Sequence, residues 1–161
     1  MYKHKFEKKL TIMVGNIGSG KSTYVKKLKD ENIIISRDAI RYMFGDGKYV
    51  FDKRLEKAVV EANFTAFNHL IETGVNIVSD ETNMNTWMRE HYIKKAKEAG
   101  YTIRAMILPR LSKEQCVNRR MQNSHGAFSA DIWEGVWQGF DDMYEIPTTE
   151  EGFDEIIMLN N

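Results

Sequence analysis

Short apolar segments alternate with longer segments of helical period along this chain. The apolar segments predict β-strands over residues 10–14, 33–36, 75–79, 103–108 and 155–159. Helical periodicity predicts helices over residues 21–29, 38–44, 52–72, 86–99 and 129–144, with another that begins at Ser112. Strands that alternate with helices favour a parallel sheet with helices on both faces, and such sheets bind ligands at the carboxyl ends of their strands. We therefore predict an α/β fold of about five strands and a single domain over residues 1–161.

Two of the predicted helices have a clear apolar face. In the helix over 52–72 that face contains Leu55, Val59, Ala62, Ala66 and Leu70, and we expect it to pack on the sheet. Between residues 128 and 144 a row of aromatic and aliphatic residues recurs at helical spacing, which favours packing over base stacking. Trp87 and Tyr42 are better candidates for stacking on a ligand.

Composition and charge narrow the class of protein. Of the 161 residues, 42% are apolar and 29% are charged, as is usual for a globular protein, and the one cysteine, Cys116, cannot form an internal disulfide. No apolar run approaches the roughly 18 residues of a membrane helix, so we expect a cytoplasmic protein without a membrane partner. All 23 Lys and Arg residues lie at or before Arg120, a bias that favours phosphate-rich partners or is spread over solvated helix faces.

The turn after the first predicted strand has the pattern of a phosphate-binding loop. Residues 15–22 read GNIGSGKS and fit G-x-x-x-x-G-K-[ST] between a strand and a helix. Backbone N–H groups of such a loop bind phosphates, the lysine (Lys21) neutralises charge on the β- and γ-phosphates, and the serine (Ser22) is a ligand for Mg²⁺. We predict that ATP or another nucleoside triphosphate binds at Gly15, Asn16, Ile17, Gly18, Ser19, Gly20, Lys21, Ser22 and Thr23.

Further charged residues lie where other strands are predicted to end. Asp38 follows the second strand and Asp80 the third, so both carboxylates should face the phosphate-binding loop, and Asp38 suits the role of general base. Arg119 and Arg120 lie late on a helix and predict a lid over about residues 112–130 that closes on the phosphates. The alternatives are that Asp38 or Ser36 only caps a helix, that Asp80 does the same, and that the two arginines only pair with surface acids.

Three segments together resemble a known family. GNIGSGKST, SRDAIR (residues 36–41) and SDETNMN (residues 79–85) are similar to the kinase domain of bacteriophage and bacterial polynucleotide 5′-hydroxyl kinases, within the small P-loop kinases that include zeta-toxin-like enzymes. The resemblance implies that Asp38 is the general base and that Arg41 contacts a phosphate of the acceptor. It also implies that Lys21 and Ser22 serve ATP and magnesium, and that a lid arginine contacts ATP. The substrate-binding residues that we predict are Arg41, Asp80, Thr82 and Asn83.

The sequence departs from the family pattern at the lid and after the third strand. Two lid arginines are often four residues apart in that family, whereas here Asn123 and Ser124 occupy those positions and His125 is the remaining candidate cation. Glu81 is inserted in the D-T-N motif, and we expect a kinase domain without the phosphatase or ligase domain that several family members have. Arg37 has no predicted role beyond a structural or solvated one.

These observations predict an ATP- and Mg²⁺-dependent kinase that phosphorylates the 5′-hydroxyl of DNA or RNA. One alternative is a kinase for a small hydroxylated molecule, a nucleoside or a modified base. Another is a zeta-toxin-like regulatory protein that binds a nucleoside triphosphate. The sequence does not predict the oligomeric state.

Overall fold

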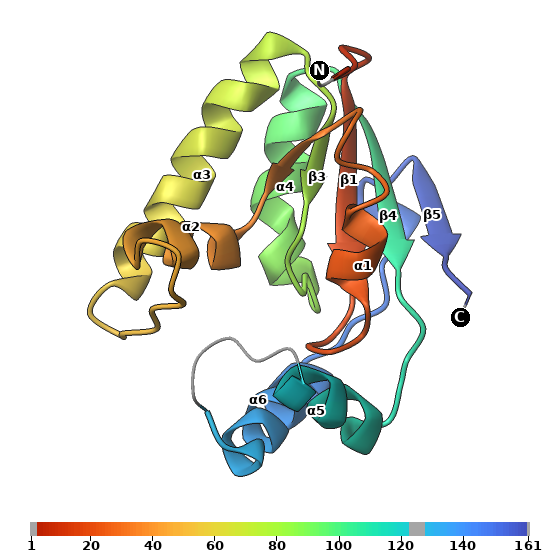
Figure 1. Cartoon of the computed structure of the whole chain (residues 1–161). Helices are drawn as coiled ribbons and strands as arrows, with labels where there is room; N and C mark the ends of the chain where they lie inside the picture. The colour runs from red at the N-terminus through yellow and green to blue at the C-terminus, as the bar shows by residue number, and fades with distance from the viewer. Residues whose placement is uncertain (1–2, 123–127, 161) are drawn as a thin grey trace.

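A computed structural model describes residues 3–122 and 128–160 and contains one parallel sheet (Figure 1). The strands are β1 (Lys9–Val14), β2 (Ile33–Ile35), β3 (Ile77–Ser79), β4 (Thr102–Ile107) and β5 (Glu155–Met158). They lie in the order β2-β3-β1-β4-β5, and every neighbouring pair is parallel. The carboxyl ends of the strands therefore share one edge of the sheet.

Helices cover both faces of this sheet, as the sequence predicts. The helices are α1 (Lys21–Val25), α2 (Arg37–Phe44), α3 (Glu56–Thr73), α4 (Thr86–Glu98), α5 (Lys113–Gln122) and α6 (Ala130–Asp142), and a 3₁₀ turn, η1, spans Thr149–Glu151. Side chains alternate along β1, so Ile12 packs against α3 and α4, whereas Met13 faces the cluster that contains Val25 of α1. This arrangement confirms the predicted α/β class with a sheet of five strands.

The face with which α3 packs on the sheet agrees only in part with the one predicted, sharing Val59 and the partly buried Leu70. Its buried row is Val59, Asn63, Phe67 and Ile71, whereas the predicted face included Leu55, which is exposed. The row contains a polar residue because the Asn63 amide finds acceptors inside the protein, Glu81 Oε1 at 2.9 Å and the Tyr92 hydroxyl at 2.7 Å. A search for apolar residues at helical spacing could not identify this face, because the buried row includes an asparagine.

α5 and α6 pack on one another beyond the carboxyl edge of the sheet (Figure 1). Trp133 of α6 and Val117 of α5 form a small apolar cluster with Ile17 of the loop that follows β1. The aromatic row over 128–144 thus packs against α5 and this loop, at the place where the lid is expected. No helix in the described residues is both long and apolar enough to cross a membrane.

Arg89 of α4 contacts the loop after β3 through hydrogen bonds, and its side chain is fully buried. Its Nη1 donates to the carbonyl oxygens of Asn83 (2.9 Å) and Glu145 (3.0 Å). Its Nε and Nη2 donate to the Glu151 carboxylate at 2.8 and 3.0 Å. One guanidinium therefore joins the β3 loop to the segment that precedes β5.

Replacing Arg89 should therefore destabilise the protein strongly. Arg89→Met leaves the Glu151 carboxylate and two carbonyl groups without their donor, and removing one partner of a buried ion pair costs about 3 kcal/mol of unfolding free energy. Lys57→Met is the matched control, because Lys57 forms an exposed pair with Glu61 at 3.8 Å, and such pairs contribute about 0.5 kcal/mol. Urea unfolding measures both values; equal losses would contradict the assigned role of Arg89.

Candidate active site at the carboxyl edge of the sheet

The loop that follows β1 is held between the β3 loop and α5. Gly15 N donates to Thr82 O at 3.0 Å, which joins the loop to the segment after β3. Gly18 and Gly20 have φ of 66° and 100°, a region that favours glycine, and a Cβ at Gly18 would collide with the backbone of Cys116. The backbone thus has the tight turns that a phosphate-binding loop needs, and residues 15–22 fit the triphosphate of ATP.

Lys21 begins α1 and turns back toward its own loop. Its Nζ donates to the carbonyl oxygens of Gly15 and Asn16, both at 2.8 Å. Burial lowers the pKa of Lys21 to about 8, and the nearby Asp80 and Asp38 carboxylates oppose this shift. The ammonium group is therefore already held in the loop where phosphates are expected to bind.

The two adjacent lid arginines point to different places. A Cβ built on Gly20 would lie 3.7 Å from Arg119 Nη1, so the Arg119 guanidinium reaches the phosphate-binding loop. The Arg120 guanidinium lies 4.5 Å from the centre of the Trp133 ring, and its Nη2 is 3.9 Å from Asp38 Oδ2. Burial lowers the pKa of Arg120, which the Asp38 charge opposes. Arg119 thus lies on the donor side and Arg120 on the Asp38 side.

Asp38 lies in the first turn of α2, but its carboxylate is not the cap. Ser36 is the N-cap and accepts from Ala39 N at 3.3 Å. Asp38 Oδ1 instead accepts from Arg41 Nη1 at 2.7 Å and from the Tyr49 hydroxyl at 3.2 Å. Helix capping by Asp38 is therefore not observed, and its carboxylate contacts other side chains instead.

Two residues that the sequence analysis missed organise the surroundings of Asp38. Glu56 of α3 accepts from Arg41 Nε at 3.0 Å and from Nη2 at 2.6 Å, a bidentate contact that fixes the guanidinium plane. Burial, together with Asp38, raises the pKa of Tyr49 to about 12, so its hydroxyl stays protonated and can donate. Nothing in the local sequence identifies either residue, because Tyr49 reaches Asp38 and Glu56 reaches Arg41 only through tertiary contacts.

Asp38 lines a cavity of about 380 Å³ at the carboxyl edge of the sheet. The cavity brings together most of the predicted substrate-side residues, namely Asp38, Arg41, Asp80, Thr82 and Arg120. Its opposite wall is apolar and comes from α6 and the residue Phe128 before it, with Ile132, Trp133, Val136 and Phe140, and Ile17 of the phosphate-binding loop also lines it. Burial raises the pKa of Asp80, and the charge of Lys21 works against this. We call this space the acceptor cavity.

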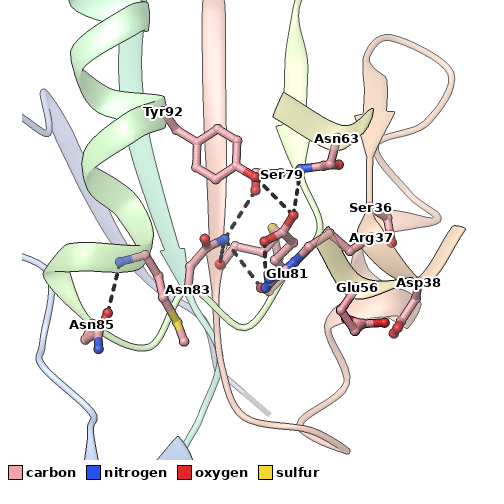
Figure 2. A network of polar contacts seen from close by, with 12 residues as sticks. Ser36, Arg37, Asp38, Glu56, Asn63, Ser79, Glu81, Asn83, Asn85 and Tyr92 are labelled. Carbon is pink, nitrogen blue, oxygen red and sulfur yellow. Dashed lines mark hydrogen bonds and ion pairs between the residues drawn. The ribbon is translucent and has the colours of Figure 1, made fainter. Parts of the chain in front are cut away.

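The inserted Glu81 is the centre of a buried polar network (Figure 2). Its Oε2 pairs with Arg37 Nη2 at 3.0 Å, and its Oε1 accepts from Asn63 Nδ2 at 2.9 Å and from the Tyr92 hydroxyl at 3.0 Å. Burial raises the pKa of Glu81, and the Arg37 charge counteracts it. Arg37, which had no assigned role, thus ties the start of α2 to the β3 loop.

Asn83 belongs to the loop after β3, and it does not line the acceptor cavity. Its side chain is buried, and its Nδ2 donates to Met13 O at 2.9 Å and to Ser79 Oγ at 3.3 Å. Its φ of 46° bends the chain at this point. This geometry favours a role in shaping the loop, although the predicted contact of Asn83 with substrate stays a prediction.

Few side chains of the site are suited to a metal ion. The described residues contain no group of three His, Cys, Asp or Glu side chains that could hold one. Ser22 and Asp80 lie at the same edge, and this limited set of oxygens fits Mg²⁺, which takes one or two protein ligands beside phosphate oxygens and water. His125, the candidate second lid cation, lies outside the described residues.

Comparison with known proteins identifies relatives of most of this chain. The AAA domain family AAA_33 matches residues 10–147. A protein of Autographa californica nuclear polyhedrosis virus, named as a bifunctional polynucleotide kinase/RNA ligase, is 28% identical over 129 residues. The match covers 73% of this chain and 18% of that protein, so the chain spans less than a fifth of the length of this relative.

Solved structures show that the fold is that of P-loop kinases. A kinase from Chloroflexus aurantiacus has a TM-score of 0.67 at 17% identity, and the match covers 94% of this chain and 86% of that one. A chain of the Pnkp1/Rnl/Hen1 complex has a TM-score of 0.57 at 24% identity, over 69% and 38%. The Mycobacterium tuberculosis APS kinase, solved with AMPPNP and APS, has a TM-score of 0.56 at 16% identity, over 100% and 91%.

The buried Lys21 predicts a pH dependence of stability. Its pKa is about 8 in the folded protein against an ordinary value of 10.5, so the unfolded chain binds more protons between these values. The free energy of unfolding, relative to that of Lys21→Met, should therefore rise as pH increases from 8 to 10. Urea unfolding at several pH values measures the difference, with the exposed Lys57→Met as control for the loss of one lysine. Parallel curves for wild type and Lys21→Met would contradict the lowered pKa.

Proposed function

The chain belongs to the AAA domain family, and from this premise we propose that it is an ATP- and Mg²⁺-dependent kinase acting on the 5′-hydroxyl of DNA or RNA ends. The observation that carries the proposal is a carboxylate, Asp38, at the mouth of a cavity beside a phosphate-binding loop. A donor triphosphate would lie on the loop and a hydroxyl acceptor in the cavity. The viral relative supports a polynucleotide acceptor, because its name includes polynucleotide kinase.

The proposed transfer needs one proton acceptor and several cations. The 5′ oxygen of the acceptor attacks the γ-phosphorus of ATP while its proton passes to a carboxylate oxygen of Asp38. The bond between the γ-phosphorus and the β,γ-bridging oxygen breaks, and ADP leaves. Lys21 and Arg119 would stabilise charge on the donor phosphates, and Arg120, beside Asp38, would face the transferring group from the acceptor side.

The metal would be held at the start of α1. We assign its ligand to the Ser22 hydroxyl, and Asp80 would hold one of its water molecules or orient the site. When bound, Mg²⁺ neutralises charge on the β- and γ-phosphates. Backbone N–H groups within residues 15–23 would bind the remaining phosphate oxygens, apart from that of Gly15, which donates to Thr82 O.

On the acceptor side, the two walls of the cavity suit the two parts of a nucleotide. Arg41 would contact a phosphate of the acceptor, and its guanidinium is already oriented by Glu56. Thr82 lines the cavity, and we assign it a contact with the acceptor. The apolar wall around Trp133 would pack against the terminal base or sugar.

A second candidate function is a kinase for a small hydroxylated molecule, a nucleoside or a modified base. A cavity of about 380 Å³ has the size of a site for a single small ligand. The chemistry at Asp38 would be the same, and the acceptor alone would differ.

Transfer of labelled γ-phosphate tests the proposal, with 5′-hydroxyl oligonucleotides, nucleosides and sugars offered as competing acceptors. We expect labelled oligonucleotides, and Asp38→Asn should lower kcat at least 100-fold while ATP affinity stays within about twofold, since a positioned base contributes about 10²–10⁴ in rate. Labelling of nucleosides or sugars alone would favour the second candidate. Transfer that survives in Asp38→Asn would exclude Asp38 as the base.

The two lid arginines should separate in kinetics, because their guanidinium groups lie on different sides of the site. Arg119→Ala should raise KM for ATP about tenfold, the size expected for one charge-assisted hydrogen bond. Arg120→Ala should leave KM for ATP nearly unchanged and lower kcat or raise KM for the acceptor. Steady-state kinetics with each substrate varied in turn measure these constants, and identical profiles for the two variants would contradict the assignment.

A further inference from the structure

A second hollow, which we call the α3–α4 groove, lies next to the acceptor cavity. It has a volume of about 400 Å³, and its lining includes Phe64, Trp87, His91 and Lys94. Arg37, Glu81 and Met88 line both this groove and the acceptor cavity. The two spaces are therefore adjacent, and the Arg37–Glu81 ion pair with Met88 forms the boundary between them.

Aromatic side chains dominate the walls of the groove. Trp87, at the start of α4, is 77% exposed, the largest exposed fraction among the large hydrophobic residues of the described chain. Phe64 of α3 and His91 of α4 lie with their ring centroids 4.3 Å apart on the other part of the lining. An exposed indole beside further rings is suited to stack on a planar ligand, and every nucleobase has such a face.

The charges of the groove favour a base over a phosphate. The charge of Arg37 is already matched by the buried Glu81 carboxylate. Lys94 and Glu90, both exposed, are the other charged residues of the lining and have opposite signs. The groove is therefore close to neutral, whereas phosphate sites need an excess of positive charge.

We propose that the α3–α4 groove is a subsite for a nucleobase of the acceptor strand, downstream of the nucleotide whose 5′-hydroxyl is phosphorylated, and that Trp87 stacks on this base. The inference rests on the proposed function, because only a polymeric acceptor extends from the acceptor cavity past the Arg37–Glu81 pair. The strand would leave the cavity at this boundary and place one base against the indole ring. A single nucleoside or sugar would end inside the first cavity and would not reach Trp87.

Acceptor length gives the first test. Trp87→Ala should raise KM for a 5′-hydroxyl hexanucleotide about tenfold, a loss in the range of one base–aromatic stack, with kcat unchanged. KM for a nucleoside 3′-monophosphate should be the same in wild type and variant. Phe6→Ala is the matched control, because Phe6 is an exposed aromatic residue (68%) outside both cavities. Equal KM values for the hexanucleotide in wild type and Trp87→Ala would overturn the subsite.

An abasic scan locates the base. One abasic nucleotide is moved along positions two to five of the hexanucleotide, and kcat/KM is measured for wild type and Trp87→Ala. At one position the abasic nucleotide should lower kcat/KM of the wild type about tenfold. It should hardly change kcat/KM of Trp87→Ala, because that variant already lacks the stacking contact. Equal losses in both proteins at every position, or no loss in either, would overturn the proposal while oligonucleotide phosphorylation still stands. Wild-type protein that labels small acceptors and no oligonucleotide would refute the proposed function itself.

Discussion

The structure around the site depends on the burial of one carboxylate, that of Glu81. A buried charge is tolerated only when it is paired and its oxygens accept hydrogen bonds, and here the donors come from three different helices. Arg37 is supplied by α2, Asn63 by α3 and Tyr92 by α4, so satisfying Glu81 fixes three helices against the loop that follows β3. Asp38 is the next residue after Arg37. The position of the candidate base is thus determined by an ion pair that does not itself take part in transfer.

On the other side of the site, α5 and α6 contact the phosphate-binding loop directly. Asn16 Nδ2 donates to Trp137 O at 2.9 Å, and Gly18 fits closely against the Cys116 backbone, so the loop, α5 and α6 contact one another directly. Two cations of the site lie against protein oxygens: Lys21 donates to two carbonyl groups, and Arg120 lies near Asp38. Phosphate oxygens are stronger partners for these cations than carbonyls are. Nucleotide binding would therefore exchange partners at side chains that are already in place.

The sequence predicted those features whose signals are local. Five strands, the helices between them and the phosphate-binding loop follow from apolar periodicity and glycine spacing, and the structure contains them. The contacts around Asp38 could not be predicted, because Tyr49 reaches Asp38, and Glu56 reaches Arg41 beside it, only in the folded protein. The buried face of α3 was predicted only in part for the same reason: Asn63 is compatible with burial only because Glu81 and a tyrosine lie opposite it. Tertiary partners decide which polar residues face inward.

The uneven distribution of charge along the sequence is partly offset by contacts in the folded protein. Acids from the last part of the chain pair with the basic part, as Glu151 does with Arg89 and Asp141 with Arg110. These contacts reduce any long-range field that the excess of Lys and Arg before residue 121 would produce. In the proposed reaction, discrimination among acceptors would rely on short-range contacts in the acceptor cavity and the α3–α4 groove. The affinity that comes from stacking and shape complementarity depends weakly on salt concentration, whereas the affinity that comes from phosphate neutralisation falls steeply as salt concentration increases. If the chain acts on strand ends as proposed, the fit of the strand in these two spaces would matter more for recognition than the overall charge of the polymer.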